Sequence, residues 1–157
     1  MQRVSTCLWF DDQAQDAAEF YVSLFPNSRI IDTNYNLEGS PRPAGSVLTV
    51  TFSLDGTEYM GLNGGPVFTF SPAISLVAHC DTQEELDVLW RSLSEGGQEG
   101  QCGWLTDRYG VSWQVVPRML QALLNTKNTA ASQRMFTAML GMTKLDIAAL
   151  QRAYDGE

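Results

Sequence analysis

The chain contains the same succession of sequence signals twice, about seventy positions apart. Residues 8–15 (Leu-Trp-Phe-Asp-Asp-Gln-Ala-Gln) run from an apolar stretch through an acidic stop into a helical pattern, and residues 76–84 do the same. Each is followed by two strand-like runs around a turn, at Asp55-Gly56 in the first half and at Tyr109-Gly110 in the second. A repeated strand–helix–hairpin unit makes two half-sheets that must bury their apolar faces. We therefore expect a concave site for a small molecule.

A length of 157 residues suits one compact domain. We expect repeat one at about 1–65, repeat two at about 72–117 and a tail at about 118–157. Alternating or apolar runs predict strands at 4–10, 28–35, 47–54, 57–63, 73–80, 102–108 and 111–116.

Helix-start signals follow the first strand of each repeat. Asp12 with Gln15, and Asp81 with Glu84, have capping-box spacing. The tail predicts three further helices, one after Pro117, one closed by Gly141 and one opened by Thr143 and Asp146. They have no counterpart in the first half, and the sequence does not decide whether they pack on the sheet or on a second subunit.

Composition excludes several classes of partner. Eighteen acidic and ten basic residues give a net charge of −8, without a Lys/Arg cluster, which disfavours nucleic acid and anionic membranes. No signal peptide and no run of about 18 apolar residues is visible, so we expect a cytoplasmic protein. The three cysteines do not form a disulfide framework, and core packing is the expected role of Cys7 and Cys80.

Several stretches carry a resemblance to a known family. They are Leu8-Trp9-Phe10-Asp11, Ala17-Ala18-Glu19-Phe20-Tyr21, Phe25-Pro26-Asn27-Ser28, residues 60–66 (Met-Gly-Leu-Asn-Gly-Gly-Pro), residues 80–87 and residues 102–117 around Gly110 and Gln114. On these the chain resembles the vicinal oxygen chelate superfamily of glyoxalase, bleomycin-resistance and extradiol dioxygenase proteins. Within it, the PhnB-like branch, often labelled demethylubiquinone methyltransferase-type, is the most similar. The resemblance implies an α+β fold of two βαβββ repeats forming a curved mixed sheet with helices outside, often as a homodimer.

Metal-using members of that superfamily hold a divalent ion with His and Glu side chains. The resemblance places those positions near Ser5, Asn63, Ala73 and Gln114, and none of them is a histidine or a carboxylate. The chain has one histidine and no H-x-x-x-H, C-x-x-C or calcium-loop spacing. We therefore expect no metal and no cofactor.

Catalytic motifs are equally sparse. A glycine-rich turn for adenosylmethionine is missing at the first strand–helix junction, which disfavours methyl transfer. His79 and Cys80 are neighbours on a strand and should face opposite sides of the sheet. Tyr59, Tyr109 and Glu58 are acid–base candidates that suit strand or turn roles equally well. Whether the chain catalyses a reaction stays open.

Strand alternation predicts which side chains line the concave face. The predicted ligand-binding set is Ser5, Cys7, Trp9, Asn63, Ser75, His79, Ser112 and Gln114. This mixture of aromatic and neutral hydrogen-bonding groups suits an unidentified small organic molecule. The alternative, given equal weight, is that these polar groups satisfy one another across a filled core.

The leading hypothesis is a metal-free protein that binds a small molecule. The alternatives are a metal-dependent lyase, isomerase or dioxygenase, a methyltransferase, and an oligomerisation module with a vestigial cleft.

Overall fold

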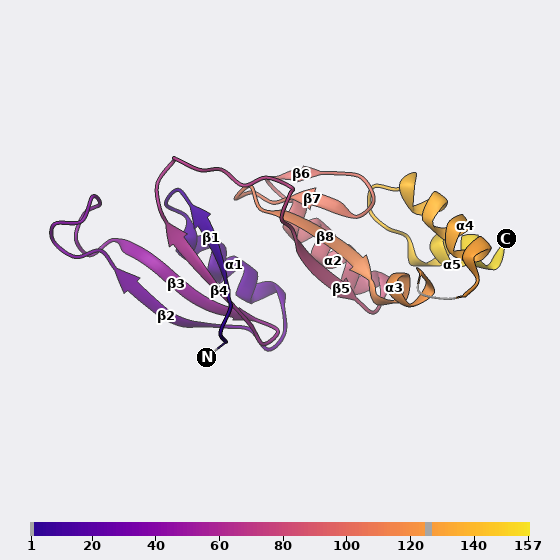
Figure 1. Cartoon of the computed structure of the whole chain (residues 1–157), viewed down its shortest axis with the longest axis horizontal. Helices are drawn as coiled ribbons and strands as arrows, with labels where there is room; N and C mark the ends of the chain where they lie inside the picture. The colour runs from indigo at the N-terminus through magenta and orange to yellow at the C-terminus, as the bar shows by residue number, and fades with distance from the viewer. Residues whose placement is uncertain (1, 125–126) are drawn as a thin grey trace. The chain divides into compact units, whose positions relative to one another are not determined.

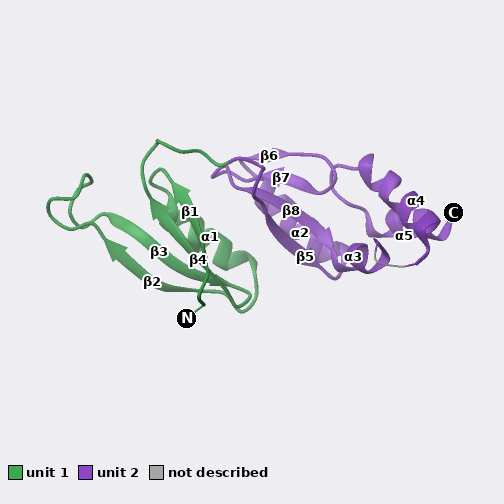
Figure 2. Cartoon of the chain, in the orientation of Figure 1, with its two compact units in different colours: residues 1–70 green, residues 71–157 purple. Residues whose placement is uncertain are grey.

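Residues 2–124 and 127–157 are described by the computed structural model, and they divide between Phe70 and Ser71 into two units (Figures 1 and 2). Unit 1 contains one four-stranded sheet and one helix. Unit 2 contains a second four-stranded sheet, its helix and the helical tail.

Unit 1 runs through β1 (Thr6–Phe10), α1 (Ala14–Leu24), β2 (Arg29–Tyr35), β3 (Val47–Leu54) and β4 (Thr57–Asn63). The strand order is β1-β4-β3-β2, in which β1 pairs with β4 in parallel and the other pairs are antiparallel. The β3–β4 hairpin turns at Asp55-Gly56, where both residues have positive φ.

Unit 2 repeats this arrangement. Its elements are β5 (Leu76–Cys80), α2 (Gln83–Ser94), β6 (Gln98–Glu99), β7 (Trp104–Thr106) and β8 (Ser112–Pro117), in the sheet order β5-β8-β7-β6. The two sheets have the same strand order and the same single parallel pair, β5 with β8. The duplicated βαβββ unit and the α+β class are therefore confirmed. The two-residue strand β6 was not foreseen, because Gln98-Glu99 carries no apolar signal.

Each sheet buries one face under the helix of its own unit. Alternate residues of two strands and one face of the helix supply each core. In unit 1, β1 and β3 contribute Leu8, Phe10, Val50 and Phe52, and α1 contributes Ala14, Ala17 and Tyr21. In unit 2, β5 and β8 contribute Leu76, Ala78, Trp113 and Val115, and α2 contributes Leu86, Trp90 and Leu93. The opposite face of each sheet is not covered by that helix. We call these opposite faces open face 1 and open face 2.

Both predicted capping boxes need correction. Asp12 does not cap α1, whose N-cap is Gln13 without a side-chain hydrogen bond. In the second repeat Thr82 replaces Asp81 as the cap, and its Oγ1 accepts from the Glu85 amide at 3.2 Å. The Glu85 carboxylate in turn accepts at 2.8 Å from the amide of Asp81, the residue before the cap, so the pair that closes this end is Thr82 and Glu85 instead of Asp81 and Glu84.

The three predicted tail helices are present as α3 (Arg118–Leu124), α4 (Thr129–Leu140) and α5 (Ile147–Asp155). The start of α5 needs correction, because Asp146 is its N-cap and accepts from the Ala149 amide, whereas Thr143 lies before the helix. The attachment of the tail helices lies in unit 2. The amides of Cys102 and Gly103 donate to the carbonyls of Met142 and Thr143, both at 2.8 Å, and Leu145 beside them is fully buried. The tail is thus packed on the second repeat. The sequence had left open whether the tail packs on the sheet or on a second subunit, and the structure shows its packing within the chain.

Within the described residues, no helix has the length and apolar character that a membrane span requires.

Candidate functional site

Open face 1 presents side chains from neighbouring strands in register. Cys7 pairs with Met60 and Trp9 pairs with Leu62, whereas Leu8 between them is buried toward α1. The predicted placement of Cys7 and Trp9 opposite the helix therefore agrees with the structure. Ser5 is exposed and directly precedes β1. Met60 and Leu62 were not predicted, because the run from Thr57 to Asn63 has no apolar alternation to read.

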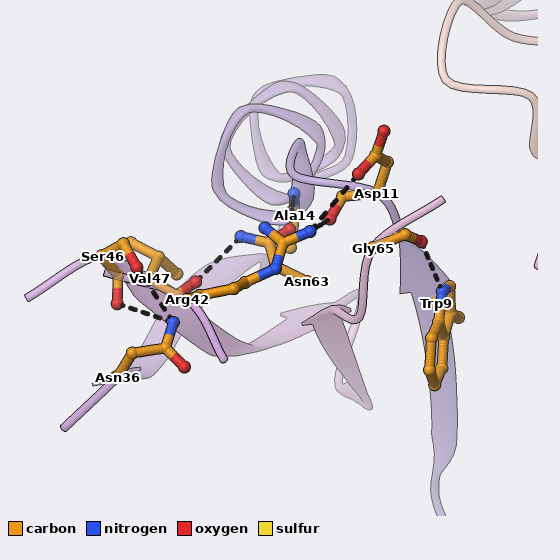
Figure 3. A network of polar contacts seen from close by, with 9 residues as sticks. All are labelled: Trp9, Asp11, Ala14, Asn36, Arg42, Ser46, Val47, Asn63 and Gly65. Atoms are coloured by element: carbon orange, nitrogen blue, oxygen red, sulfur yellow. Dashed lines mark hydrogen bonds and ion pairs between the residues drawn. The ribbon is translucent and has the colours of Figure 1, made fainter. Parts of the chain in front are cut away.

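Trp9 is held by the segment that follows β4. Its indole N–H donates to the Gly65 carbonyl at 2.9 Å (Figure 3). Its ring meets Phe68 edge-on, with 4.9 Å between the ring centroids. A Cβ on Gly64 would overlap the indole, so glycine is required there for this close approach. Trp9 therefore offers a ligand aromatic surface and no free donor.

Asn63 is not on open face 1, so this part of the prediction is wrong. Its Oδ1 accepts from the Ala14 amide at 2.8 Å, its Nδ2 donates to the Val47 carbonyl at 3.1 Å, and it is 5% exposed (Figure 3). It pairs with Phe10 on the face that α1 covers. Its amide satisfies the first turn of α1, a role that the sequence had assigned to Asp12.

A second polar contact fixes the loop between β2 and β3. Arg42 in this loop donates from one nitrogen to the Asp11 carbonyl at 2.6 Å and forms an ion pair with the Asp11 carboxylate at 3.3 Å (Figure 3). At the base of the loop, the Asn36 side chain donates to the Ser46 hydroxyl at 3.0 Å. The contact of Arg42 with Asp11 was not predicted. Nothing in the sequence of a Pro- and Gly-rich loop indicates which distant residue its arginine will bind.

The cysteines divide between surface and core. Cys80 is buried, as expected, but Cys7 is exposed, so its predicted core role is wrong. Partial desolvation raises the pKa of the Cys7 thiol above its ordinary value. Burial, followed by the negative charges of Glu85 and Asp81, raises the pKa of Cys80 to about 11. Neither thiol is prepared as a nucleophile at neutral pH.

Open face 2 carries most of the predicted polar residues. Val77 pairs with Gln114 and His79 with Val116 across β5 and β8, and the alternate residues of β5 are buried. The Gln114 Nε2 atom donates to the Ser75 hydroxyl at 3.0 Å. His79 is exposed and Cys80 is buried, which places them on opposite faces as predicted.

Two further residues belong to open face 2 by register. Trp104 pairs with Gln114, and Thr106 pairs with Ser112. Ser112 is only 4% exposed, so it contributes little surface. Trp104 was missed because β7 is three residues long and offers no alternation from which to read its face.

Tyr59 is removed as an acid–base candidate for the open faces. It pairs with Phe52 and stacks on its ring at 5.6 Å between centroids, on the side of α1. Burial raises the pKa of Tyr59.

The residues at the superfamily's metal positions do not fit a transition metal. Both amide atoms of Asn63 are used within unit 1, Gln114 donates to Ser75, Ala73 has no donor and Ser5 offers a neutral hydroxyl. Such ions require imidazole, thiolate or carboxylate ligands that converge. Over residues 2–124 and 127–157, no group of three or more His, Cys, Asp or Glu side chains is placed to hold a metal ion.

Comparison with known proteins adds independent information. A family model described as 3-demethylubiquinone-9 3-methyltransferase matches residues 2–116. A solved PhnB protein from Bacillus cereus, named as a 3-demethylubiquinone-9 3-methyltransferase, is 37% identical with a TM-score of 0.69, over 74% of this chain and 99% of that one. A search of curated proteins gave no match.

Two more distant structures share the fold alone. Protein PA1353 from Pseudomonas aeruginosa is 20% identical with a TM-score of 0.61, over 74% of this chain and 98% of that one. The fosfomycin resistance protein FosX from Listeria monocytogenes is 12% identical with a TM-score of 0.51, over 77% and 96%.

Proposed function

This chain belongs to the PhnB-like 3-demethylubiquinone-9 3-methyltransferase family of the vicinal oxygen chelate superfamily, and on that premise we propose that it binds a small organic molecule on its open sheet faces without a metal. The methyltransferase activity in the family's name has no counterpart in the site. The β1–α1 junction is Asp11-Asp12-Gln13, without a glycine-rich turn, and the first amide of α1, that of Ala14, donates to Asn63.

One observation carries the proposal. On open face 2, the hydrogen-bonded pair of Gln114 and Ser75 lies beside Val77, whose side chain is 43% exposed, and His79 in the same strand is exposed as well. A neutral polar pair next to apolar surface and an imidazole suits a weakly polar organic ligand. On open face 1, Trp9 and Met60 supply aromatic and thioether surface of the same character.

The proposal is tested by thermal shift against a library of metabolites. A ligand that binds the folded state raises the melting temperature by mass action, by several degrees at about 100 times Kd. We expect a hit whose effect disappears when Gln114 and Ser75 are both replaced by alanine. Gln151→Ala is the matched control, because Gln151 is an exposed residue of α5 whose side chain, among the described residues, donates to Asp155 alone. A library without hits would contradict the proposal, and so would a set of hits of which the double variant loses none.

The competing activities have their own measurements. Zinc, nickel, iron or manganese retained in stoichiometric amount after dialysis of the untagged protein would favour a metal-dependent lyase, isomerase or dioxygenase. Binding heat with adenosylmethionine in calorimetry would favour methyl transfer. We expect neither result.

We also propose that the protein acts in the cytoplasm as a homodimer. Light scattering of the purified chain should then give twice the 17.4 kDa chain mass. A monomer at tens of micromolar would refute the dimer.

A further inference from the structure

A hollow of about 500 Å³ lies in unit 1 at the end of the sheet where the β3–β4 hairpin turns. Its lining includes Asn27, Arg29, Ile31, Ser53, Gly56 and Glu58. Its volume lies within the range of small-molecule sites, although its lining is more polar than usual. This hollow is separate from the residues on which the proposed function rests.

Three of the lining residues form one row across three strands. Arg29 on β2 pairs with Ser53 on β3, which pairs with Glu58 on β4. Paired residues share a face, and Phe52 next to Ser53 is buried toward α1, so this row lies on open face 1. Strands lie about 4.8 Å apart, which puts the backbones of Arg29 and Glu58 about 10 Å from each other.

The walls of the hollow are fixed by local geometry. The Asp55 amide donates to the Ser28 hydroxyl at 3.0 Å, which ties the turn before β2 to the hairpin turn. Asn27 and Gly56 both have positive φ, at 52° and 84°, and they face each other across this junction. The register shift between Ile30 and Asp32 is a bulge, and Ile31 at this bulge lines the hollow with an apolar side chain.

The polar side chains in the hollow are not used by the fold. Among the residues that the structure describes, Asn27, Arg29, Ser53 and Glu58 make no side-chain hydrogen bond or ion pair. Arg29 and Glu58 have opposite charges and lie on either side of Ser53, and they form no ion pair among the residues that the structure describes. A guanidinium binds a carboxylate with two parallel hydrogen bonds, and a carboxylate accepts readily from an ammonium group.

We propose that this hollow binds a small zwitterion of dipeptide size, with its carboxylate on Arg29 and its ammonium group on Glu58. In a single α-amino acid both charges sit on one carbon. A dipeptide separates them by a peptide unit, which adds about 3.8 Å between Cα atoms and spans more of the gap between the strands. The peptide group then lies beside the Ser53 hydroxyl and the Asn27 amide, which supply its hydrogen bonds, and a side chain can contact Ile31.

The test is a titration followed by backbone amide NMR, with glycylglycine as the probe. We expect saturable shifts of the amides of Arg29, Ser53 and Gly56. Arg29→Gln and Glu58→Gln should each weaken binding about tenfold, since each removes one charge-assisted contact. Arg91→Gln and Glu38→Gln are charge-matched controls at exposed positions outside the hollow, and they should leave the affinity unchanged.

Two altered probes identify which end binds where. N-acetylglycylglycine lacks the ammonium group, so it should bind weakly to the native chain and lose nothing more in Glu58→Gln. Glycylglycinamide lacks the carboxylate, so it should also bind weakly, and Arg29→Gln should not weaken its binding further. Shifts that never saturate, equal affinity for all three probes, or no difference between the hollow variants and the controls would overturn the proposal. None of these results depends on a ligand at Gln114 and Ser75, so the two sites succeed or fail separately.

Discussion

Asn63 joins three segments of unit 1 through one buried amide. Its oxygen accepts from the start of α1, its nitrogen donates to the start of β3, and its own backbone ends β4. A buried amide that makes both bonds is worth more than an exposed one, because removing it leaves a donor and an acceptor without partners in the core.

Asn63→Ala should lower the free energy of unfolding by about 2 kcal/mol, as two buried hydrogen bonds are lost. Urea denaturation measures the change. Asn34→Ala is the matched control, because in the described part of the chain the exposed Asn34 side chain makes one hydrogen bond, to Thr49 at 3.2 Å. Its loss should cost less than about 0.5 kcal/mol. Equal effects of the two variants would show that the amide of Asn63 has no special role.

Because of Cys80, the free energy of unfolding should decrease at alkaline pH. Its thiol has an ordinary pKa near 9, which burial and the neighbouring carboxylates raise to about 11 in the folded state. Below pH 9 both states keep the proton. Between about pH 9 and 11 only the unfolded state loses it, so the free energy of unfolding falls as the pH rises.

The difference in unfolding free energy between the native chain and Cys80→Val should therefore be flat up to about pH 8.5. From there toward pH 11, the unfolding free energy of the native chain should fall relative to that of Cys80→Val by on the order of 2 kcal/mol. Denaturation at a series of pH values gives both curves, and taking their difference removes the contribution of other alkaline groups such as Tyr59. Parallel curves over the whole range would refute this account.

At the scale of elements, the sequence predicted most of the fold but not the face of every strand. Strands β3 and β4 have their predicted bounds, and α1 and the tail helices lie where the apolar spacing indicated. The face of β1 was correct because the resemblance placed Ser5 on the open side, and Cys7 and Trp9 follow from it by alternation. In β4 a one-residue error of parity moved Asn63 to the wrong side, since side chains in a strand alternate with a period of two.

The caps show a second limit of local patterns. The amide at the start of α1 is satisfied by a residue 49 positions away, which no spacing rule for adjacent residues can detect. Likewise Trp104 and Met60 join the open faces only through pairing with distant strands. The site residues were thus predictable within one strand, where the side of one residue fixes the sides of the others. They were not predictable where a residue joins a face through its pairing with a distant strand.

The first turn of α2 also holds the tail in place within unit 2. The side-chain Nε2 of Gln83 donates to the Leu145 carbonyl at 3.1 Å and to the Asp87 carboxylate at 2.9 Å. The side-chain Oε1 of Gln83 accepts from the backbone amide of Ile147 at 2.8 Å. Ile147 is the first residue of α5, so Gln83 caps the tail helix from another element.

Gln83→Ala should destabilise the protein by about 1–2 kcal/mol and speed hydrogen exchange at the amides of α5 and of Cys102 and Gly103, while the amides of unit 1 stay protected. Gln15→Ala is the control, because the side chain of exposed Gln15 donates to Glu19 within α1 and to no other residue that the structure describes. Unchanged exchange in α5 would mean that the tail is held by its apolar contacts alone.

At the scale of the whole molecule, charge is distributed unevenly along the chain. Residues 1–116 contain fifteen acidic and five basic residues, whereas residues 117–157 contain three acidic and five basic ones. The strongly acidic part coincides with the region that the family model matches. A polyanion would meet repulsion over most of this region.

We therefore expect no measurable retention of duplex DNA or of anionic vesicles at about 100 mM salt, since binding of either depends on cations that release counterions. Gel-shift and vesicle-sedimentation assays check this, with a basic DNA-binding protein as the positive control. Binding that weakens steeply with added salt would contradict the expectation and point to the cations of the tail.

The irregular outer strand of unit 1 also bears on how the protein behaves when concentrated. Strand β2 lies at the rim of its sheet, and its pairing is interrupted twice, between Ile30 and Asp32 and between Asn34 and Tyr35. A kinked rim with Arg29 and Asp32 on it is a poor template for a strand from another molecule. The backbone geometry of β2 therefore disfavours fibril formation and edge-to-edge aggregation at this strand, independently of any ligand.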